Sequence, residues 1–251
     1  MTEDSKLNQL LLNLPKGALV LSSWLESEGY SYELQQRYRN SGWLKSIGRG
    51  VMIRMGEKPV LAAAITALQQ QANVSIHIGG RTALSLLGFS HYLEMSEKET
   101  TLFAGRGVKL PAWIRENEWD TTPHVYCTSF LNANIGLVDQ LIGTEMLKIS
   151  GSTRAMMECL YLCPLQFPLS EAYELMEGLS TLRPAQVQEL LEQCESIKVK
   201  RLFLFFAEKA GHAWLKYVDI KNVNIGSGKR SIVPNGVLTS KYQLVLPEDV
   251  I

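Results

Sequence analysis

A short stretch near the N-terminus constrains the fold of this chain more than any other part of the sequence. A helix can begin at Ser22 and end at Gly29, and a second helix is predicted at Tyr32–Asn40, behind a serine that can cap it. Leucines at helical spacing predict an earlier helix over residues 7–14. Two short helices across a glycine-containing turn, after a first helix, form the helix-turn-helix arrangement.

The segment behind the second helix predicts a β-hairpin. The runs "WLKSI" and "VMIR" are β-prone, and Gly48–Gly50 between them can supply the positive φ angles of a tight turn. No helix is predicted after Gly50, so this Gly-Arg-Gly step does not match a phosphate loop at a helix start. A helix-turn-helix followed at once by a hairpin is the winged-helix layout. We expect Trp43, between the helix and the hairpin, to lie in the core.

The second helix and the hairpin carry the residues predicted to contact DNA. At about 100° per residue, Leu34 and Tyr38 share an inward face, and polar side chains form the opposite face. Arginine, glutamine and asparagine match base edges in the major groove, and cations on a hairpin can meet phosphates. The predicted DNA-contacting residues are Tyr32, Gln35, Gln36, Arg37, Arg39, Asn40, Lys45, Arg49 and Arg54. The alternative is an amphipathic helix whose polar face is only solvated.

The charge of the chain is balanced overall but unevenly distributed. The sequence has 25 Lys and Arg against 25 Asp and Glu, yet residues 31–58 carry six basic and two acidic residues, and residues 196–251 carry nine and four. Local basic patches on a neutral chain suit site-specific contact with a polyanion. A second basic patch could contact DNA or an acidic partner, or could form a solvated rim. It comprises Lys198, Lys200, Arg201, Lys229 and Arg230.

The rest of the chain predicts a mixed α/β region. Helices are predicted over residues 60–72, 80–88, 153–162, 170–179 and 184–194, and strands over 74–78, 100–104, 124–130 and 145–150. The end of the chain is predicted to be β-rich, with strands at 201–206, 212–220 and 241–246. The predicted fold class is α+β, with a winged helix-turn-helix domain over residues 1–95 and a mixed α/β domain over residues 96–251.

Few residues could carry catalysis. The four histidines are scattered, and His77 alternates with apolar neighbours, which favours a structural role. Glu145 and Lys148, like Glu195 and Lys198, bring a carboxylate near a lysine, without the tighter strand spacing of metal nucleases. The strand, glycine pair and helix over residues 76–88 could bind a phosphate or form only a tight turn. We predict a protein that is not an enzyme and has no metal or cofactor. The alternative is a metal-dependent enzyme acting on nucleic acid.

The sequence contains no targeting or spanning segment that can be recognised. No run of about 18 apolar residues is present, and the N-terminus lacks a signal-peptide core. The four cysteines show neither metal-binding nor disulfide-framework spacing. We therefore expect a cytoplasmic protein without a membrane partner.

Several segments resemble the AbiEi antitoxin family of type IV toxin–antitoxin systems, found in bacterial abortive-infection operons. They are "SGWLKSIGRGVMIRMGE", "ALQQQANVSIHIGGRTALSLLGFSHYL", "LPAWIRE", "LMEGLSTLRPAQVQELLEQC" and "KVKRLFLFFAEKAGHAWLKYVDIKNVNIGSGKRSIVPNGVLTSKYQLVLP". The resemblance covers nearly the whole chain in order. In one place it departs, because "GSTRAMME" has Thr153 where an acidic residue is expected.

The resemblance implies a two-domain autorepressor. The winged helix would bind inverted repeats in the promoter of its own operon, with Tyr32–Asn40 as recognition helix and Gly48–Gly50 as wing tip. The second domain would counter a nucleotidyltransferase-like toxin without forming a stable complex with it. We expect a monomer in solution, since no self-association stripe is visible. A stand-alone winged-helix regulator is the alternative.

Overall fold

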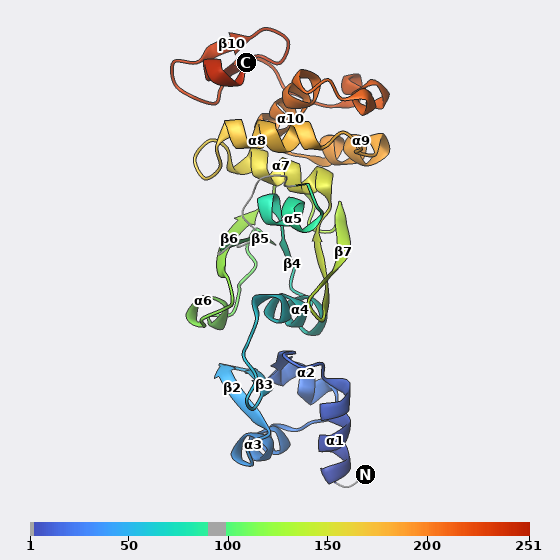
Figure 1. Ribbon diagram of the computed structural model, residues 1–251, viewed down its shortest axis with the longest axis vertical. Helices are drawn as coiled ribbons and strands as arrows, with labels where there is room; N and C mark the ends of the chain where they lie inside the picture. Colours follow the sequence, from blue (N-terminus) through green and yellow to red (C-terminus); the bar gives the residue numbers. More distant parts are fainter. Residues whose placement is uncertain (1–2, 90–98) are drawn as a thin grey trace.

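The chain is built as a stack of layers along one long axis (Figure 1). The computed structural model describes residues 3–89 and 99–251. The N-terminal helices and hairpin lie at one end, a five-stranded sheet lies in the middle, and a group of helices leads to the C-terminal strands at the other end. We call residues 3–54 the head, and residues 60–89 and 99–251 the body.

The head has the element order of a winged helix-turn-helix. Its elements are α1 (Glu3–Asn13), β1 (Val20–Leu21), α2 (Ser22–Ser27), α3 (Tyr32–Asn40), β2 (Leu44–Gly48) and β3 (Val51–Arg54). The Ser31 side chain caps α3 by accepting a hydrogen bond from the backbone N–H of Leu34 at 3.3 Å. Gly29, with φ at +85°, ends the preceding helix and lets the chain reverse into α3. This order is consistent with the predicted winged helix.

The head has a three-stranded sheet in the order β1-β3-β2, and its strands β1 and β3 are buried on both faces. Val20 and Met52 pack into the head's own core with α1, α2 and α3. Their neighbours Leu19, Leu21 and Val51 pack into the core of the body instead. Successive side chains of a strand point to opposite faces, so this alternation places the sheet between the two cores.

The body begins with elements that precede residue 95 and share one sheet with elements that follow it. They are α4 (Leu61–Gln71), β4 (Ile76–Ile78), α5 (Gly80–Leu86), β5 (Glu99–Gly105), α6 (Trp113–Glu116), β6 (Thr122–Thr128), β7 (Leu137–Ile142) and β8 (Glu145–Ser150). The sheet order is β6-β5-β4-β8-β7, with β4 antiparallel to β5 and parallel to β8. Strands from both sides of the predicted division therefore pair directly, and the division into domains stays a prediction.

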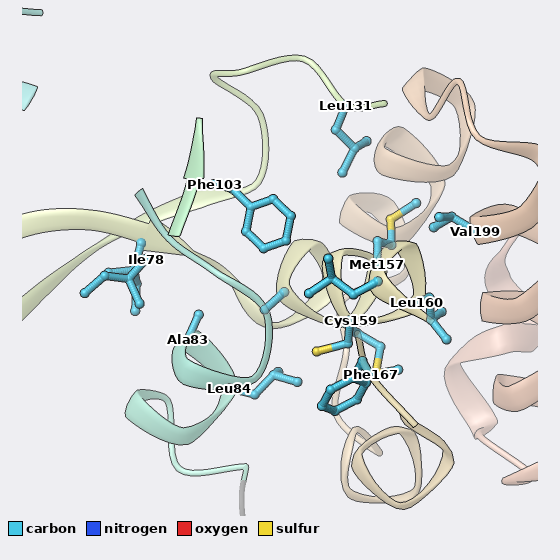
Figure 2. Packing of buried hydrophobic residues seen from close by; sticks show 14 of the residues in the cluster. Ile78, Ala83, Leu84, Phe103, Leu131, Met157, Cys159, Leu160, Phe167 and Val199 are labelled. Carbon is cyan, nitrogen blue, oxygen red and sulfur yellow. The ribbon is translucent and has the colours of Figure 1, made fainter. Parts of the chain in front are cut away.

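Four helices continue the body above this sheet. They are α7 (Ser152–Leu162), α8 (Leu169–Gly178), α9 (Pro184–Gln193) and α10 (Ile197–Lys209). Figure 2 shows Met157, Cys159 and Leu160 of α7 between α5, β5 and α10. All three side chains are buried. Helix α7 is thus the centre of the core. Among the described residues, no helix is long and apolar enough to cross a membrane.

The predicted α+β class is confirmed, but two strand predictions near the C-terminus are wrong. Residues 201–206 belong to α10, and residues 212–220 form the 3-10 helices η1 (Ala213–Tyr217) and η2 (Ile220–Asn222). A continuous apolar run fits a helix buried on all sides as well as a buried strand, and α10 is such a helix. The terminal sheet is small, with β9 (Arg230–Ser231), β10 (Val237–Thr239) and β11 (Leu244–Leu246).

A single buried carboxylate joins the sheet to its covering helices. Glu158 Oε1 lies 2.9 Å from His77 Nε2 and accepts a hydrogen bond from Arg154 Nε at 2.9 Å. Its Oε2 accepts from the backbone N–H of Gly80 at 2.9 Å and from Ser150 Oγ at 2.7 Å. Burial alone would raise the pKa of Glu158, but His77, Arg154 and Ser150 together hold the pKa below its ordinary value. The network ties together β4, α5, β8 and α7.

This network settles the question raised by the glycine pair of residues 79–80. The backbone N–H at the start of α5 is already bonded to Glu158. A Cβ atom at Gly79 would collide with the same carboxylate. The glycines therefore allow a tight approach of the chain's own side chain, and the helix start has no room for a phosphate. His77 has the structural role predicted for it. Thr153, at the departure from the family pattern, is fully buried.

We predict that Glu158→Gln lowers the free energy of unfolding by about 3–5 kcal/mol at neutral pH, because it leaves buried Arg154 without its counter-charge. The lowered pKa means that the charged form of Glu158 stabilises the fold above its unfolded-state value of 4.5 and loses this effect as the pH falls through the folded-state value. The difference in free energy of unfolding between the wild type and Glu158→Gln, measured by urea unfolding, should therefore shrink below pH 4.5.

The control is Glu171→Gln, which removes a more exposed carboxylate that also pairs with an arginine, Arg81, at 3.0 Å. It should cost about 0–1 kcal/mol. Equal losses in both variants would contradict a central role for Glu158.

Candidate nucleic-acid interface

A cleft between α3 and the hairpin brings together three of the predicted DNA-contacting residues. The cleft has a volume of about 310 Å³ and is lined by residues of α2, α3, β2 and β3 and by the hairpin turn. Tyr32 and Arg39 line it from α3, and Arg49 lines it from the turn. Helix α3 and the wing tip therefore line the same cleft.

Within the described part of the chain, no carboxylate forms an ion pair with either arginine of the cleft, Arg39 or Arg49. Arg39 is half-buried, and its Nη1 lies 3.3 Å from the thioether sulfur of Met52, which is only a weak acceptor. Arg49 is exposed at the tip. The cleft thus holds positive charge that no carboxylate of residues 3–89 and 99–251 pairs with, as a site for an anion requires.

Tyr32 forms the rim of the cleft and is 55% exposed. A hydrogen bond to the Glu26 carboxylate, the largest effect, raises the pKa of its phenol. The ring can stack on a ligand, while its single O–H already donates to Glu26.

The outward face of α3 presents the other polar residues predicted for base contact. Gln36, Arg37 and Asn40 are exposed, while Leu34 and Tyr38 are buried against the head's core, as the helical spacing predicts. One face of the helix therefore packs on the head's core, and the other can contact a ligand, which is the arrangement of a recognition helix.

Gln35 is not available for DNA, contrary to prediction, because its side chain is 0% exposed. Its Oε1 accepts a hydrogen bond from Ser22 Oγ at 2.5 Å. Its Nε2 donates to the carbonyls of Ser22 at 3.0 Å and Tyr30 at 2.7 Å. The amide joins α3 to the start of α2 and to the turn between them. Helical spacing alone could not separate this buried glutamine from its exposed neighbour Gln36.

The structure also removes Arg54 and Lys45 from the cleft. Arg54 is half-buried, and its Nη2 donates to the carbonyl of Leu14 at 2.7 Å, tying β3 to the end of α1. Lys45 pairs with Ile53, which packs into the body's core, whereas Met52 lines the cleft. Because neighbouring residues of a strand point to opposite faces, Lys45 lies on the other face of the sheet from the cleft.

Two features of the hairpin were not foreseen from the sequence. Gly48 packs against α6, and a Cβ atom there would lie 2.5 Å from Trp113 Cβ. The wing is therefore seated on the body. Trp43, expected in the core, is 49% exposed, because the adjacent Leu44 takes the buried position.

Most of the predicted second basic patch is inside the protein. Lys198 Nζ donates to the carbonyls of Tyr161 and Cys163, both at 2.6 Å, and so satisfies the C-terminal end of α7. Arg201 is 2% exposed, and its Nε donates to the carbonyl of Ile225 at 2.7 Å. Both cations are committed to backbone oxygens, which corrects their assignment to a binding surface.

The remaining three residues of that patch do not form a surface together. Lys200 is buried, and only Lys229 and Arg230 are exposed. The lysines of the carboxylate–lysine pairs considered for a nuclease have other partners, since Lys148 pairs with Asp139 at 3.2 Å and Lys198 donates to backbone carbonyls. Across residues 3–89 and 99–251, no group of three or more His, Cys, Asp or Glu could hold a metal ion.

The fold and the cleft are consistent with a transcriptional regulator that has a winged helix-turn-helix head. Two family models match almost the entire chain. One, described as the N-terminal domain of the transcriptional regulator AbiEi antitoxin, matches residues 3–95. The other, described as the transcriptional regulator AbiEi antitoxin of type IV toxin–antitoxin systems, matches residues 97–247. The chain belongs to the AbiEi antitoxin family.

A solved structure shares the fold at low sequence identity. The crystal structure of the RV2827C protein from Mycobacterium tuberculosis is 15% identical, with a TM-score of 0.58 over 95% of this chain and 89% of that chain. A search of curated proteins gives no match.

We predict that Gln35→Ala destabilises the protein by about 1–3 kcal/mol, because it leaves buried backbone and hydroxyl partners unsatisfied. The matched control Gln36→Ala removes an exposed amide of the same helix and should change the free energy of unfolding by less than about 0.5 kcal/mol. Urea unfolding of both variants measures the difference. A Gln35→Ala variant as stable as Gln36→Ala would show that the buried amide does not hold α3.

Proposed function

We propose that the chain represses its own operon by binding inverted repeats in the promoter through α3 and the wing tip. The observation that carries this proposal is the cleft in which Arg39 and Arg49 converge, with no acidic partner among the described residues. A backbone phosphate supplies the negative charge for Arg49, and base edges supply the acceptors for Arg39. The family description, a transcriptional regulator, supports the same function.

The two sides of the cleft have different roles in this proposal. The outward face of α3 enters the major groove, where Gln36, Arg39 and Asn40 meet base edges. Arg49 lies at the wing tip beside α3 and contacts a phosphate. Base contacts select the operator, and phosphate contacts fix the orientation of the head on it.

We also propose that the body supplies the antitoxin activity. It counters a nucleotidyltransferase-like toxin without a stable complex and acts without being an enzyme. The family description, an antitoxin of a type IV system, supports this assignment. Repression and protection then reside in different parts of one chain, which can be separated by substitutions in the head.

We predict that Arg39→Ala weakens operator binding by about 1–3 kcal/mol and relaxes its specificity, because it removes a base contact. Arg49→Ala should weaken operator and random DNA alike and lower the slope of log K against log salt by about one. Mobility-shift titrations at several salt concentrations measure both effects. Lys216→Ala removes an exposed lysine from the body and serves as the control. A wild-type protein with no preference for the upstream repeats would refute DNA-based autorepression.

We predict that the full-length double variant with Arg39→Ala and Arg49→Ala still protects cells from the toxin. Both side chains lie in the head, away from the body's core, so their loss should abolish repression alone. Growth with the toxin under a separate inducible promoter measures protection, and a promoter fusion measures repression. Loss of protection together with repression would show that the head is needed for both activities. A wild-type chain that does not protect against the separately expressed toxin would favour a chain that acts only as a transcriptional regulator.

A further inference from the structure

Three consecutive glutamines end α4, and the amide of each bonds to backbone. Gln69 Nε2 donates to the carbonyls of Ile76 at 2.7 Å and Lys148 at 2.8 Å, and its Oε1 accepts from the N–H of Lys148 at 2.9 Å. Gln70 Nε2 donates to the carbonyl of Met146 at 2.9 Å. These bonds fasten the end of α4 to β4 and β8 within the body.

The third glutamine reaches out of the body into the head. Gln71 Nε2 donates to the carbonyl of Leu19 at 2.8 Å, and its Oε1 accepts from the N–H of Leu21 at 2.8 Å. β1 is an edge strand of the head's sheet, so these are the groups that a further strand would pair with. One side chain of the body therefore takes the place of a fourth strand.

Gln71 adds direction to an interface whose other contacts, among the described residues, are made by apolar side chains and Gly48. Leu19, Leu21 and Ile53 of the head pack into the body's core, but apolar burial has no preferred orientation. Hydrogen bonds impose both distance and angle, and a pair of them on one strand fixes its direction. The contact of Gly48 with Trp113 holds the sheet at a second point.

We propose that Gln71 is a positioning residue for operator binding. It fixes the orientation of the head on the body, so that α3 is presented to DNA in one orientation although Gln71 touches no DNA. This inference rests on the proposed DNA binding. A head that samples several orientations binds with an affinity reduced by the fraction of molecules in the competent one, so an occupancy of one tenth weakens binding about tenfold.

The first measurement tests orientation without DNA. Cys127 is exposed and the other three cysteines are buried, so a spin label can be placed on Cys127 and a second on Glu28→Cys in the head. Pulsed dipolar spectroscopy of the full-length Glu28→Cys protein should give a narrow distribution of distances between the two labels. Adding Gln71→Ala should broaden the distribution. The matched control Gln70→Ala removes a bond of the same kind within the body and should leave the distribution narrow.

The second measurement tests the consequence for DNA. Gln71→Ala should weaken binding to the upstream repeats about tenfold and leave binding to random duplex of equal length unchanged, because phosphate-contacting residues are intact. Gln70→Ala should change neither. Gln71→Glu keeps an acceptor for Leu21 but loses the donor to Leu19, so it should resemble Gln71→Ala.

The possible results separate this inference from the proposed function. A distribution that stays narrow in Gln71→Ala overturns the positioning role, as does a broadened distribution with unchanged operator affinity. In both cases operator binding by the wild type would still stand. A wild type without operator preference would refute the proposed function and the positioning role with it.

Discussion

The small sheet of the head, whose strands β1 and β3 are buried on both faces, is the constraint on which the rest of the structure depends. One face completes the core under α1, α2 and α3, and the other contributes Leu19, Leu21 and Val51 to the core of the body. A head whose sheet packed only on its own helices could be joined to the body by a flexible segment, and its orientation would then not be fixed. Here the same strands serve two cores, so the orientation of the candidate DNA-binding surface depends on how the body is packed.

The body in turn is organised around Glu158. Its carboxylate receives partners from β4, α5, β8 and α7, which are far apart in the chain. Burying a carboxylate is costly unless each oxygen is bonded, and here both oxygens have two partners. Gln69 of α4 bonds to β4 of this sheet, and Gln71, two residues later in the same helix, bonds to the head. Polar groups therefore specify the arrangement that apolar burial stabilises.

The sequence predicted well where the signal was local. Ser31 as a cap, Gly29 as a stop and Gly50 in the hairpin turn depend on a few neighbouring residues, and the structure has these features where they were expected. The prediction failed where the outcome depended on distant packing. The run over residues 202–206 is apolar because α10 packs against α7 and α8, and Gln35 and Arg201 are buried because their partners come from other elements. No pattern within one helix reports such partners. The roles of the cleft residues in DNA binding stay predictions.

The division of labour along α3 has a consequence for how such a regulator can evolve. The residues that hold the helix, Leu34, Gln35 and Tyr38, are inside, and those that face outward are Gln36, Arg37 and Asn40. Substitutions on the outer face need not disturb the packing that fixes the helix. Under the proposed function, new operators would therefore be acquired through a few exposed positions of α3, while the body of the chain is left unchanged.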